Sequence, residues 1–261
     1  MNLDLSHKTA IVCGSTQGIG KASAQELARL GARIILIARN EDKLKAVLSE
    51  LDVSEGQEHT YLVADFKRAD ELRKNLENFM PGNTVHILVN NTGGPAGGPA
   101  NEAELEEFRI AFNMHLICNH ILVQAVKEGM KTAGYGRIIN IISTSVKQPL
   151  PNLGVSNTIR GAVANWSKTL ANELGQYNIT VNNVLPGATN TSRLKQIIES
   201  KAAKTGKTYD QILNEMSEAS PMKRVAQPEE IANAVAFLAS PAASYINGIN
   251  VPVDGGRTKS L

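Results

Sequence analysis

The chain has 261 residues, of which 42% are hydrophobic and 20% are charged, and its formal net charge is +2. This length suits one large α/β domain or two small ones, and the composition is ordinary for a soluble globular protein. So small a net charge gives no reason to expect a nucleic acid or a membrane surface as partner. The two cysteines, Cys13 and Cys118, form no Cys-x-x-Cys pair, and the histidines lack metal-ligand spacing. We therefore expect no disulfide framework and no bound metal.

The ends of the sequence carry no recognisable targeting signal. The first residues lack a basic region followed by an apolar core, so we expect no signal peptide. No apolar run approaches the ~18 residues that a membrane span needs. The last three residues, Lys259-Ser260-Leu261, do not match the peroxisomal Ser-Lys-Leu signal. These features together predict a protein of the reducing cytoplasm.

A glycine-rich turn follows the first predicted strand, residues 9–13, and precedes a helical pattern over residues 21–30. Glycines make such a turn tight and let a pyrophosphate approach the backbone, where the free N–H groups of the helix favour negative charge. A tight turn without a ligand would show the same glycines, and the spacing is not the commoner Gly-x-Gly-x-x-Gly. The candidate cofactor contacts in this turn are Gly14, Ser15, Thr16, Gln17, Gly18, Ile19 and Gly20.

Arg39 follows the second predicted strand, residues 33–37, and precedes an amphipathic helix over residues 41–51. Dinucleotide-binding folds place an acidic residue about 20 positions after the glycines when the ribose hydroxyl is free, and an arginine when it is phosphorylated. An arginine fork suits a phosphate dianion, so the sequence favours NADP(H) over NAD(H). The competing interpretation is a surface arginine at a strand end.

The third and fourth predicted strands, residues 61–64 and 85–89, both lead into polar segments. Asp65 is placed either to accept a hydrogen bond from an adenine amino group or to cap the helix expected over residues 68–79. Asn91 begins a loop dense in glycine and proline, which must leave the sheet at its carboxyl edge, where open α/β sheets bind ligands. A loop without a ligand is the alternative.

The second half of the chain continues to alternate helices and strands. A long helix over residues 102–131 contains His115, the strand at 136–142 leads to Ser143, and the next helix has one apolar stripe. After a sixth strand at 179–185, two helical segments around residues 193–204 and 210–217 could form a lid over the ligand edge or an ordinary surface helix pair. A helix at 229–239 and a strand at 249–253 complete the pattern.

This alternation predicts one Rossmann-type, doubly wound parallel sheet of about seven strands with helices on both faces. We find no linker, no repeat and no second domain, so residues 1–261 are predicted to be a single dinucleotide-binding domain, with the helical lid over roughly residues 191–224.

In its motifs the chain resembles the short-chain dehydrogenase/reductase family, and within it the β-ketoacyl-acyl-carrier-protein reductase-like members. The motifs are Gly14-x-x-x-Gly18-Ile19-Gly20, Asn90-Asn91-x-Gly93, Gly136-Arg137-Ile138 leading to Ser143, Pro186-Gly187-x-x-x-Thr191, and Asp254-Gly255-Gly256. The resemblance covers nearly the whole chain. It implies a nicotinamide cofactor, a homo-oligomer (tetramer or dimer), Asn91 beside the cofactor and Thr191 on the nicotinamide amide.

The catalytic positions depart from the family pattern. The family uses an asparagine, a serine and a Tyr-x-x-x-Lys pair; Ser143 matches the serine, whereas Ser156 stands for the tyrosine, Arg160 for the lysine and His115 for the asparagine. A serine hydroxyl is a far weaker acid than a tyrosine, and arginine does not release a proton in proteins. Arg160 could still hold the ribose hydroxyls, and His115 is either the replacement proton donor or a structural histidine.

Three functions remain open at this stage. The first is an NADP(H)-binding oxidoreductase with an altered proton path, acting on a carbonyl or secondary alcohol of a small molecule or acyl thioester. The second is a nucleotide-binding or scaffold protein that has lost its chemistry. A third and weaker hypothesis is elimination or isomerisation on the same scaffold, with His115 as base.

Overall fold

A single parallel β-sheet forms the centre of the molecule. The structure is a computed structural model that describes residues 1–260. The strand order is β3-β2-β1-β4-β5-β6-β7, and every neighbouring pair is parallel, as the alternating pattern predicts. The strands are β1 (Thr9–Cys13), β2 (Arg33–Ala38), β3 (Thr60–Val63), β4 (Ile87–Asn90), β5 (Gly136–Ile141), β6 (Ile179–Pro186) and β7 (Asn250–Val253).

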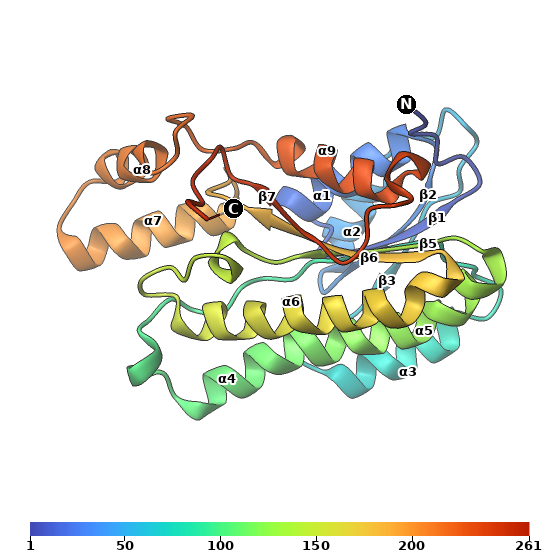
Figure 1. Cartoon of the computed structure of the whole chain (residues 1–261), viewed down its shortest axis with the longest axis horizontal. Helices are drawn as coiled ribbons and strands as arrows, with labels where there is room; N and C mark the ends of the chain where they lie inside the picture. Colours follow the sequence, from blue (N-terminus) through green and yellow to red (C-terminus); the bar gives the residue numbers. More distant parts are fainter. Residues whose placement is uncertain (261) are drawn as a thin grey trace.

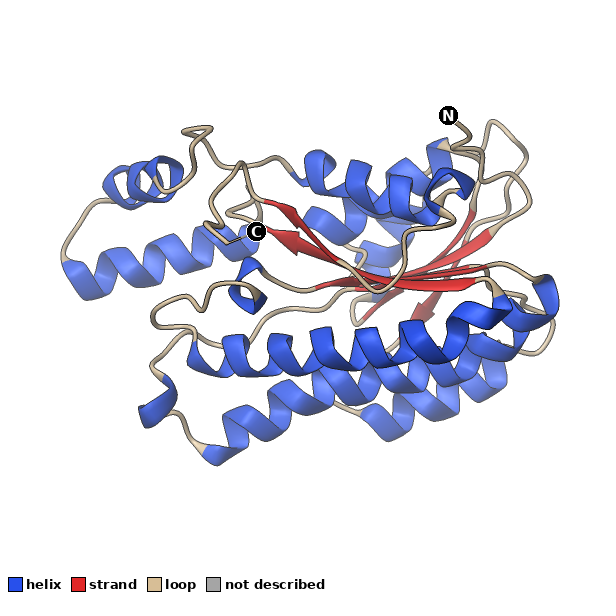
Figure 2. Cartoon of the chain, viewed as in Figure 1, coloured by secondary structure: helices blue, strands red, loops and turns tan. Residues whose placement is uncertain are grey.

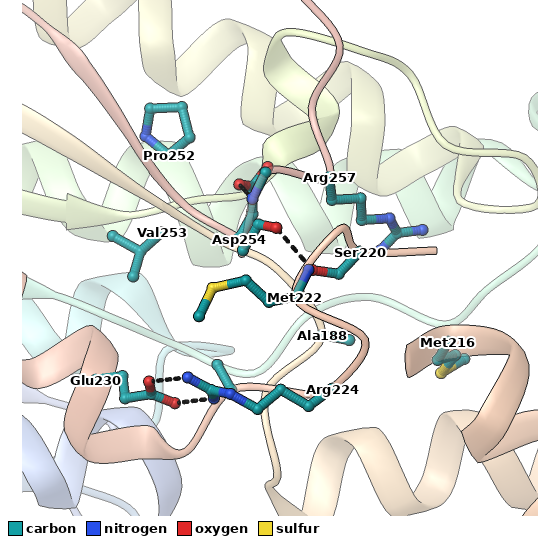
Figure 3. A pocket seen from close by; sticks show the side chains of 13 residues that line it. Ala188, Met216, Ser220, Met222, Arg224, Glu230, Pro252, Val253, Asp254 and Arg257 are labelled. Atoms are coloured by element: carbon teal, nitrogen blue, oxygen red, sulfur yellow. Dashed lines mark hydrogen bonds and ion pairs between the residues drawn. The ribbon is translucent and has the colours of Figure 1, made fainter. Parts of the chain in front are cut away.

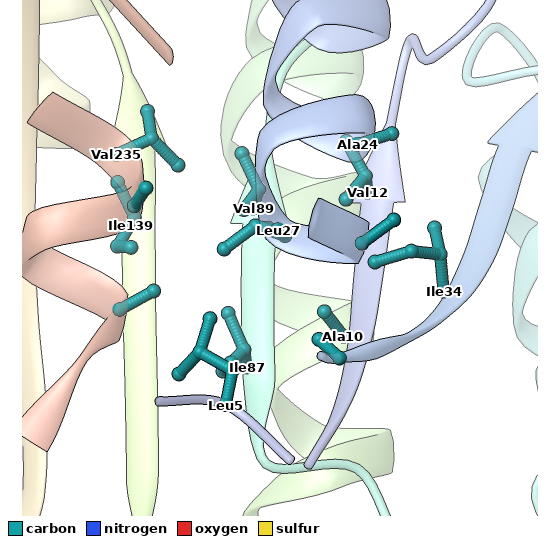
Figure 4. Packing of buried hydrophobic residues seen from close by; sticks show 14 of the residues in the cluster. Leu5, Ala10, Val12, Ala24, Leu27, Ile34, Ile87, Val89, Ile139 and Val235 are labelled. Atoms are coloured by element: carbon teal, nitrogen blue, oxygen red, sulfur yellow. The ribbon is translucent and has the colours of Figure 1, made fainter. Parts of the chain in front are cut away.

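Helices cover both faces of this sheet, which gives the three layers seen in Figures 1 and 2. One face carries α1 (Gly18–Arg29), α2 (Glu41–Leu48) and α9 (Pro228–Ala239); the other carries α3 (Ala69–Phe79), α5 (Cys118–Ala133) and α6 (Gly154–Leu174). Each face has its own apolar core. In the first, Leu27 of α1 and Val235 of α9 pack toward the sheet residues Val12, Val89 and Ile139 (Figure 4). The predicted doubly wound Rossmann-type fold is therefore confirmed.

The strand order reverses between β1 and β4, and this places the glycine-rich turn beside the start of the Asn91 loop. The chain leaves β1 toward β2 and β3, then crosses to β4 on the opposite side of β1. At such a switch point the loops after the two strands separate and leave a crevice at the carboxyl edge. The polar segments that follow β1, β2, β4, β5 and β6 all lie at this edge.

A row of asparagines crosses the sheet close to the same edge. Asn90, Asn140, Asn183 and Asn250 stand opposite one another on β4 to β7. Their amides are joined by hydrogen bonds of 2.8, 3.1 and 2.8 Å in that order, and Asn140 also donates to Ser167 Oγ of α6 at 2.9 Å. Buried polar groups need such partners, and a connected network fixes their positions. The row therefore holds four strands and α6 in register beneath the candidate site.

The segment predicted as one helix over residues 102–131 is interrupted. A 3₁₀ turn covers Ala100–Glu102, and α4 (Leu105–Phe112) begins later than expected because Glu104 and Glu107 form a capping box at its start. Between α4 and α5 the residues Asn113–Ile117 form a π-helical turn that contains His115. Such turns inside α-helices are frequent at functional sites. The other element boundaries differ from the predicted ones by three residues or fewer.

The two helical segments predicted after β6 are present as α7 (Ser192–Thr205) and α8 (Tyr209–Glu218). They extend away from the sheet at the left of Figure 1 and share a small core that includes Leu194, Ile198 and Ile212. Glu215 of α8 pairs with Lys201 and Lys207, and these bonds lower the pKa of Glu215 to about 2. Within residues 1–260, no helix combines the length and the apolarity that crossing a membrane requires.

Candidate active site

The glycine-rich turn is held in a conformation that side chains would obstruct. Gly14 and Gly18 have φ values of 58° and 54°, in the left-handed region that favours glycine. A Cβ on Gly20 would stand 2.3 Å from the carbonyl oxygen of Gly14. The N-cap residue Gln17 makes no side-chain capping bond, and the first turn of α1 contains no acid. The N–H groups at the start of α1 are therefore available to an anion.

Ser15 and Asn91 fix this turn from two sides. The Ser15 side chain is buried, and its Oγ donates to the carbonyl of Ile37 on β2 at 3.4 Å. Asn91 Nδ2 donates to the carbonyls of Cys13 and Gly14 at 3.2 and 3.4 Å. The side chain of Asn91 thus ties the end of β4 to the turn after β1, which is a positioning role for the residue predicted to lie beside the cofactor.

Arg39 and Asp65 lie just after the ends of β2 and β3. Arg39 is exposed, and none of the ion pairs among residues 1–260 includes it, so its guanidinium is available to a phosphate. Asp65 accepts from the backbone N–H of Lys67 at 3.0 Å, while α3 begins only at Ala69. The alternative that Asp65 caps this helix is therefore wrong, because its carboxylate closes a turn before the helix.

Thr191 brings the first residue of the predicted lid against the glycine-rich turn. A Cβ on Gly18 would stand 2.9 Å from Thr191 Cγ2. The Thr191 hydroxyl accepts from the N–H of Leu194 at 3.3 Å and so caps α7. The start of α7 is thereby fixed next to the start of α1.

Ser143 and Ser156 are both partly buried, on different elements of the carboxyl edge. Ser143 lies two residues after the end of β5, and its Oγ accepts from the N–H of Ser145 at 3.1 Å. Because that bond uses a lone pair, the hydroxyl proton of Ser143 remains free to be donated. Ser156 lies in the first turn of α6, one turn before Arg160.

His115 is buried in the π-helical turn, with 2% of its surface exposed. Burial, followed by the nearby charge of Arg160, holds its pKa well below the usual 6.5, while a hydrogen bond with the backbone of Gly93 acts in the opposite direction. Its Nε2 atom has no hydrogen-bond partner among residues 1–260. The ring is thus neutral at pH 7, and this argues against a role as an imidazolium acid.

Arg160 and Arg193 approach the loop after β4 from two helices. Arg160 reaches from α6 to the carbonyl of Ile141 on β5, with Nη1 at 2.6 Å. Arg193 reaches from the first turn of α7 to the carbonyl of Pro95, with Nη2 at 2.5 Å. Both guanidinium groups come within about 4 Å of the point where a Cβ on Gly94 would lie. Arg193 is a candidate site residue that the sequence analysis missed.

The position of Arg193 does carry one sequence signal. It is a basic residue in the first turn of a helix, two residues after the capping threonine, and in that place the helix dipole disfavours positive charge. A cation that the helix dipole disfavours is expected to interact with a group outside its own helix.

A separate cleft of about 240 Å³ lies between the C-terminal loop, the end of α8 and the start of α9 (Figure 3). Met222, Asp254 and the ion-paired Arg224 and Glu230 line part of it. None of the residues predicted to bind the cofactor or to take part in catalysis belongs to its lining. The cleft is therefore distinct from the candidate site.

The cysteines and acids give no second kind of chemistry at the site. Cys13 and Cys118 are buried and free, and burial raises the pKa of the Cys118 thiol to about 12. No group of three or more histidine, cysteine or acidic side chains in the described part of the chain could hold a metal ion.

The reversed strand order and the open helix terminus behind a glycine-rich turn define an α/β protein built to bind a dinucleotide. A family model described as "Enoyl-(Acyl carrier protein) reductase" matches residues 14–258. The NADPH-dependent reductase BacG of Bacillus subtilis is 30% identical over 98% of this chain and 100% of its own length. The 7alpha-hydroxysteroid dehydrogenase of Escherichia coli is 33% identical over 100% of this chain and 98% of its own.

The solved structures agree with the sequence comparisons. The L-sorbose reductase from Gluconobacter frateurii, complexed with NADPH and L-sorbose, superimposes with a TM-score of 0.93 at 32% identity, and the match covers all of both chains. This chain belongs to the short-chain dehydrogenase/reductase family of oxidoreductases.

Proposed function

We propose that this protein is an NADP(H)-dependent oxidoreductase that interconverts a carbonyl and a secondary alcohol, with a 3-oxoacyl thioester among the candidate substrates. The observation that carries the proposal is that the glycine-rich turn, Arg39 and Ser143 stand at one carboxyl edge of the sheet. The full-length relatives include reductases and dehydrogenases, so we do not favour an inactive scaffold.

The preference for NADP(H) rests on Arg39. Its exposed guanidinium follows β2, where a dinucleotide fold places the group that meets the 2′ position of the adenosine ribose. A guanidinium there attracts a 2′-phosphate through charge-assisted hydrogen bonds, which a free hydroxyl cannot match. Two of the similar structures are an NADPH-dependent reductase and an L-sorbose reductase complexed with NADPH, in line with this choice.

The catalytic tetrad is proposed to be altered, with charge stabilisation kept and the tyrosine acid replaced. When bound, NADPH supplies the hydride that reduces a carbonyl carbon, and negative charge then develops on the carbonyl oxygen. We assign Ser143 Oγ to donate the hydrogen bond to that oxygen, while the nearby positive charge of Arg160 favours the developing negative charge without a direct contact. Burial lowers the pKa of Arg160 to about 10, which leaves the guanidinium protonated at pH 7 and unable to deliver a proton.

Ser156 and His115 are proposed to act through hydrogen bonds. Ser156 occupies the place where the family has its tyrosine, and its hydroxyl is too weak an acid to replace the phenol. The free Nε2 of His115 is proposed to orient a polar group of the substrate. None of these side chains is an adequate acid, so the alkoxide is proposed to take its proton from solvent water, and the rate depends on that step.

The lid, Thr191, the oligomeric state and the location also belong to the proposal. The segment 191–224 acts as a lid, since Thr191 contacts Gly18 and Arg193 contacts the loop after β4. Thr191 contributes to the nicotinamide end of the cofactor site. The protein works in the cytoplasm as a homo-oligomer, a dimer or a tetramer, and its partner is a small-molecule or acyl-thioester substrate.

The test is NADPH oxidation, followed by absorbance, with a panel of ketones, hydroxyketones and acetoacetyl thioesters. We expect turnover with at least one carbonyl compound, and a loss of about 10²- to 10³-fold on Ser143→Ala, the usual cost of removing one donor to a developing oxyanion. Ser54→Ala, an exposed serine far from the sheet edge, is the matched control. Binding of NADPH without oxidation by any carbonyl compound would refute the proposed reaction and favour the scaffold.

A further inference from the structure

The candidate site contains two guanidinium groups without a counter-charge. Arg160 is 9% exposed, and its Nε atom has no hydrogen-bond partner within the described residues. Its Nη1 and the Nη2 of Arg193 are bonded only to neutral carbonyls, those of Ile141 and Pro95. No ion pair found between residues 1 and 260 includes either arginine.

This arrangement is electrostatically unfavourable in the protein alone. Burial of a charged group is costly unless it is paired; Arg160 is buried, Arg193 is half-buried, and the two cations also repel each other. Burial, followed by repulsion from Arg193, lowers the pKa of Arg160 to about 10. Nearby His115 is neutral and leaves its Nε2 free. The site thus contains guanidinium N–H donors and two positive charges. One anionic ligand would accept hydrogen bonds from these donors and balance the charge.

The cofactor does not supply this anion. Its negative groups are the pyrophosphate, which fits the start of α1, and the 2′-phosphate, which fits Arg39. The ribose hydroxyls at the nicotinamide end could accept a hydrogen bond from Arg160, but they are neutral and balance neither charge. The remaining anion must come from the second ligand.

The loop between the two arginines leaves room for such a ligand. No heavy atom lies within 4 Å of the position of a Cβ on Gly93, and the atoms nearest to that of Gly94 belong to the two guanidinium groups. The far end of this loop is held at the start of α6, because Gly98 forms backbone hydrogen bonds of 2.9 Å with Asn152 and Gly154. Arg160 and Arg193 therefore face an uncrowded stretch of backbone.

We propose that Arg160 and Arg193 together bind a carboxylate of the substrate, so that the protein acts on oxo acids or the corresponding hydroxy acids. This inference rests on the proposed function and names its substrate class. Arg193 is a binding residue that determines specificity, and its position in the first turn of α7 couples the carboxylate to the start of the lid. Two guanidinium groups suit a carboxylate because each offers planar N–H donors to its oxygens.

The first measurement is binding. We would record the melting temperature with NADP⁺ alone and then with NADP⁺ plus phenylpyruvate, acetoacetate or levulinate, each compared with its methyl ester. The three acids place the carboxylate at increasing distances from the ketone. At least one acid is expected to add stabilisation that its ester does not, and to bind at least tenfold more tightly than the ester.

The second measurement is the response to substitution. Arg193→Gln is expected to raise the KM for the preferred acid at least tenfold, to leave the KM for the ester within twofold, and to abolish the extra thermal shift. Arg193→Lys keeps the charge and should recover part of the acid preference. Lys195→Gln is the matched control, because Lys195 is an exposed cation on the same helix that pairs only with Glu199, at 3.9 Å.

Failure of this inference and failure of the proposed function have different outcomes. If neither NADPH nor NADP⁺ shifts the melting temperature of the wild-type protein, the proposed function is wrong. If the cofactor binds and ketones are reduced, but acids and esters behave alike or Arg193→Gln keeps the acid preference, the carboxylate site is wrong while the oxidoreductase stands.

Discussion

The glycine-rich turn offers the sharpest test of how the protein is proposed to hold its cofactor. We choose Gly18→Ala, because Gly18 combines a φ of 54° with a Cβ direction that leads to Thr191 Cγ2 at 2.9 Å. Gly82→Ala is the matched control. Gly82 has a φ of 83°, lies in the loop between α3 and β4, and has no atom within 4 Å of its Cβ position.

The two substitutions share one cost and differ in another. A left-handed backbone costs an alanine about 1–2 kcal/mol, so each variant should melt about 2–8 °C lower at ~2–4 °C per kcal/mol. Gly18→Ala adds the contact with Thr191 and places a methyl group where we propose that the pyrophosphate approaches. A tenfold loss of NADPH affinity would then remove about 1.4 kcal/mol of ligand stabilisation, or about 3–6 °C.

The assay is thermal unfolding of both variants at one fixed, saturating NADPH concentration and without ligand. Gly82→Ala should keep the full NADPH-induced shift, whereas Gly18→Ala should lose at least half of it. Thr191→Ser removes the methyl group that the new Cβ meets but keeps the capping hydroxyl, so the double variant should recover the steric part of the lost stability. An unchanged NADPH shift in Gly18→Ala would show that the pyrophosphate does not rest on this turn.

The remaining predictions concern the adenosine end, the proton path and pH. Arg39→Asp should raise the Kd for NADPH at least tenfold and change the Kd for NADH by no more than about threefold, since a hydrogen bond to a charged group is worth about 1.5–3 kcal/mol. An equal rise of both Kd values would contradict the role of Arg39. Ser156→Tyr with Arg160→Lys should raise turnover at least tenfold by restoring the family's acid, and unchanged or lower kcat would indicate a rebuilt site. Burial lowers the pKa of His115 below its unfolded value near 6.5, so the stability that its neutral form contributes is present above about pH 6.5 and is lost as pH falls. His115→Gln should therefore reduce the loss of unfolding free energy, measured with urea, as the pH falls below 6.5. His86, whose pKa is also lowered, should still contribute its own part of that loss. An unchanged pH dependence would show that His115 takes up a proton in the folded protein as readily as in the unfolded one.

The layered fold could be predicted from the sequence because its signals are local. Thr9–Cys13 is a short apolar run followed by glycines, and the same strand-then-helix pattern repeats along the chain. Each repeat predicts a strand followed by a helical crossover to the next parallel strand. Only a few sheet topologies accommodate such a series of crossovers. The polar segments after the strands could be assigned to one edge for the same reason.

The parts that the sequence did not predict depend on contacts between distant segments. The asparagine row links residues that lie far apart in the chain, and each asparagine alone interrupts an apolar strand without showing its partner. Arg193 meets Pro95 across the mouth of the crevice, and no local pattern pairs them. The π-helical turn at His115 adds a residue to a helix whose periodicity otherwise looks unbroken.

The positioning role of Asn91 is a similar case. Its place after β4 indicated proximity to the cofactor, yet the amide is engaged with the carbonyls of Cys13 and Gly14. Sequence position could identify the neighbourhood of this residue, whereas the direction of its side chain depends on the register of β1 and β4.

The most direct test of the central claim is a calorimetric titration of the wild-type protein with NADPH and, in parallel, with NADH. We expect one NADPH per chain, bound at least tenfold more tightly than NADH, because only NADPH carries the 2′-phosphate that Arg39 is proposed to bind. Absence of heat and of competition with either nucleotide would contradict the claim that this crevice is a dinucleotide site.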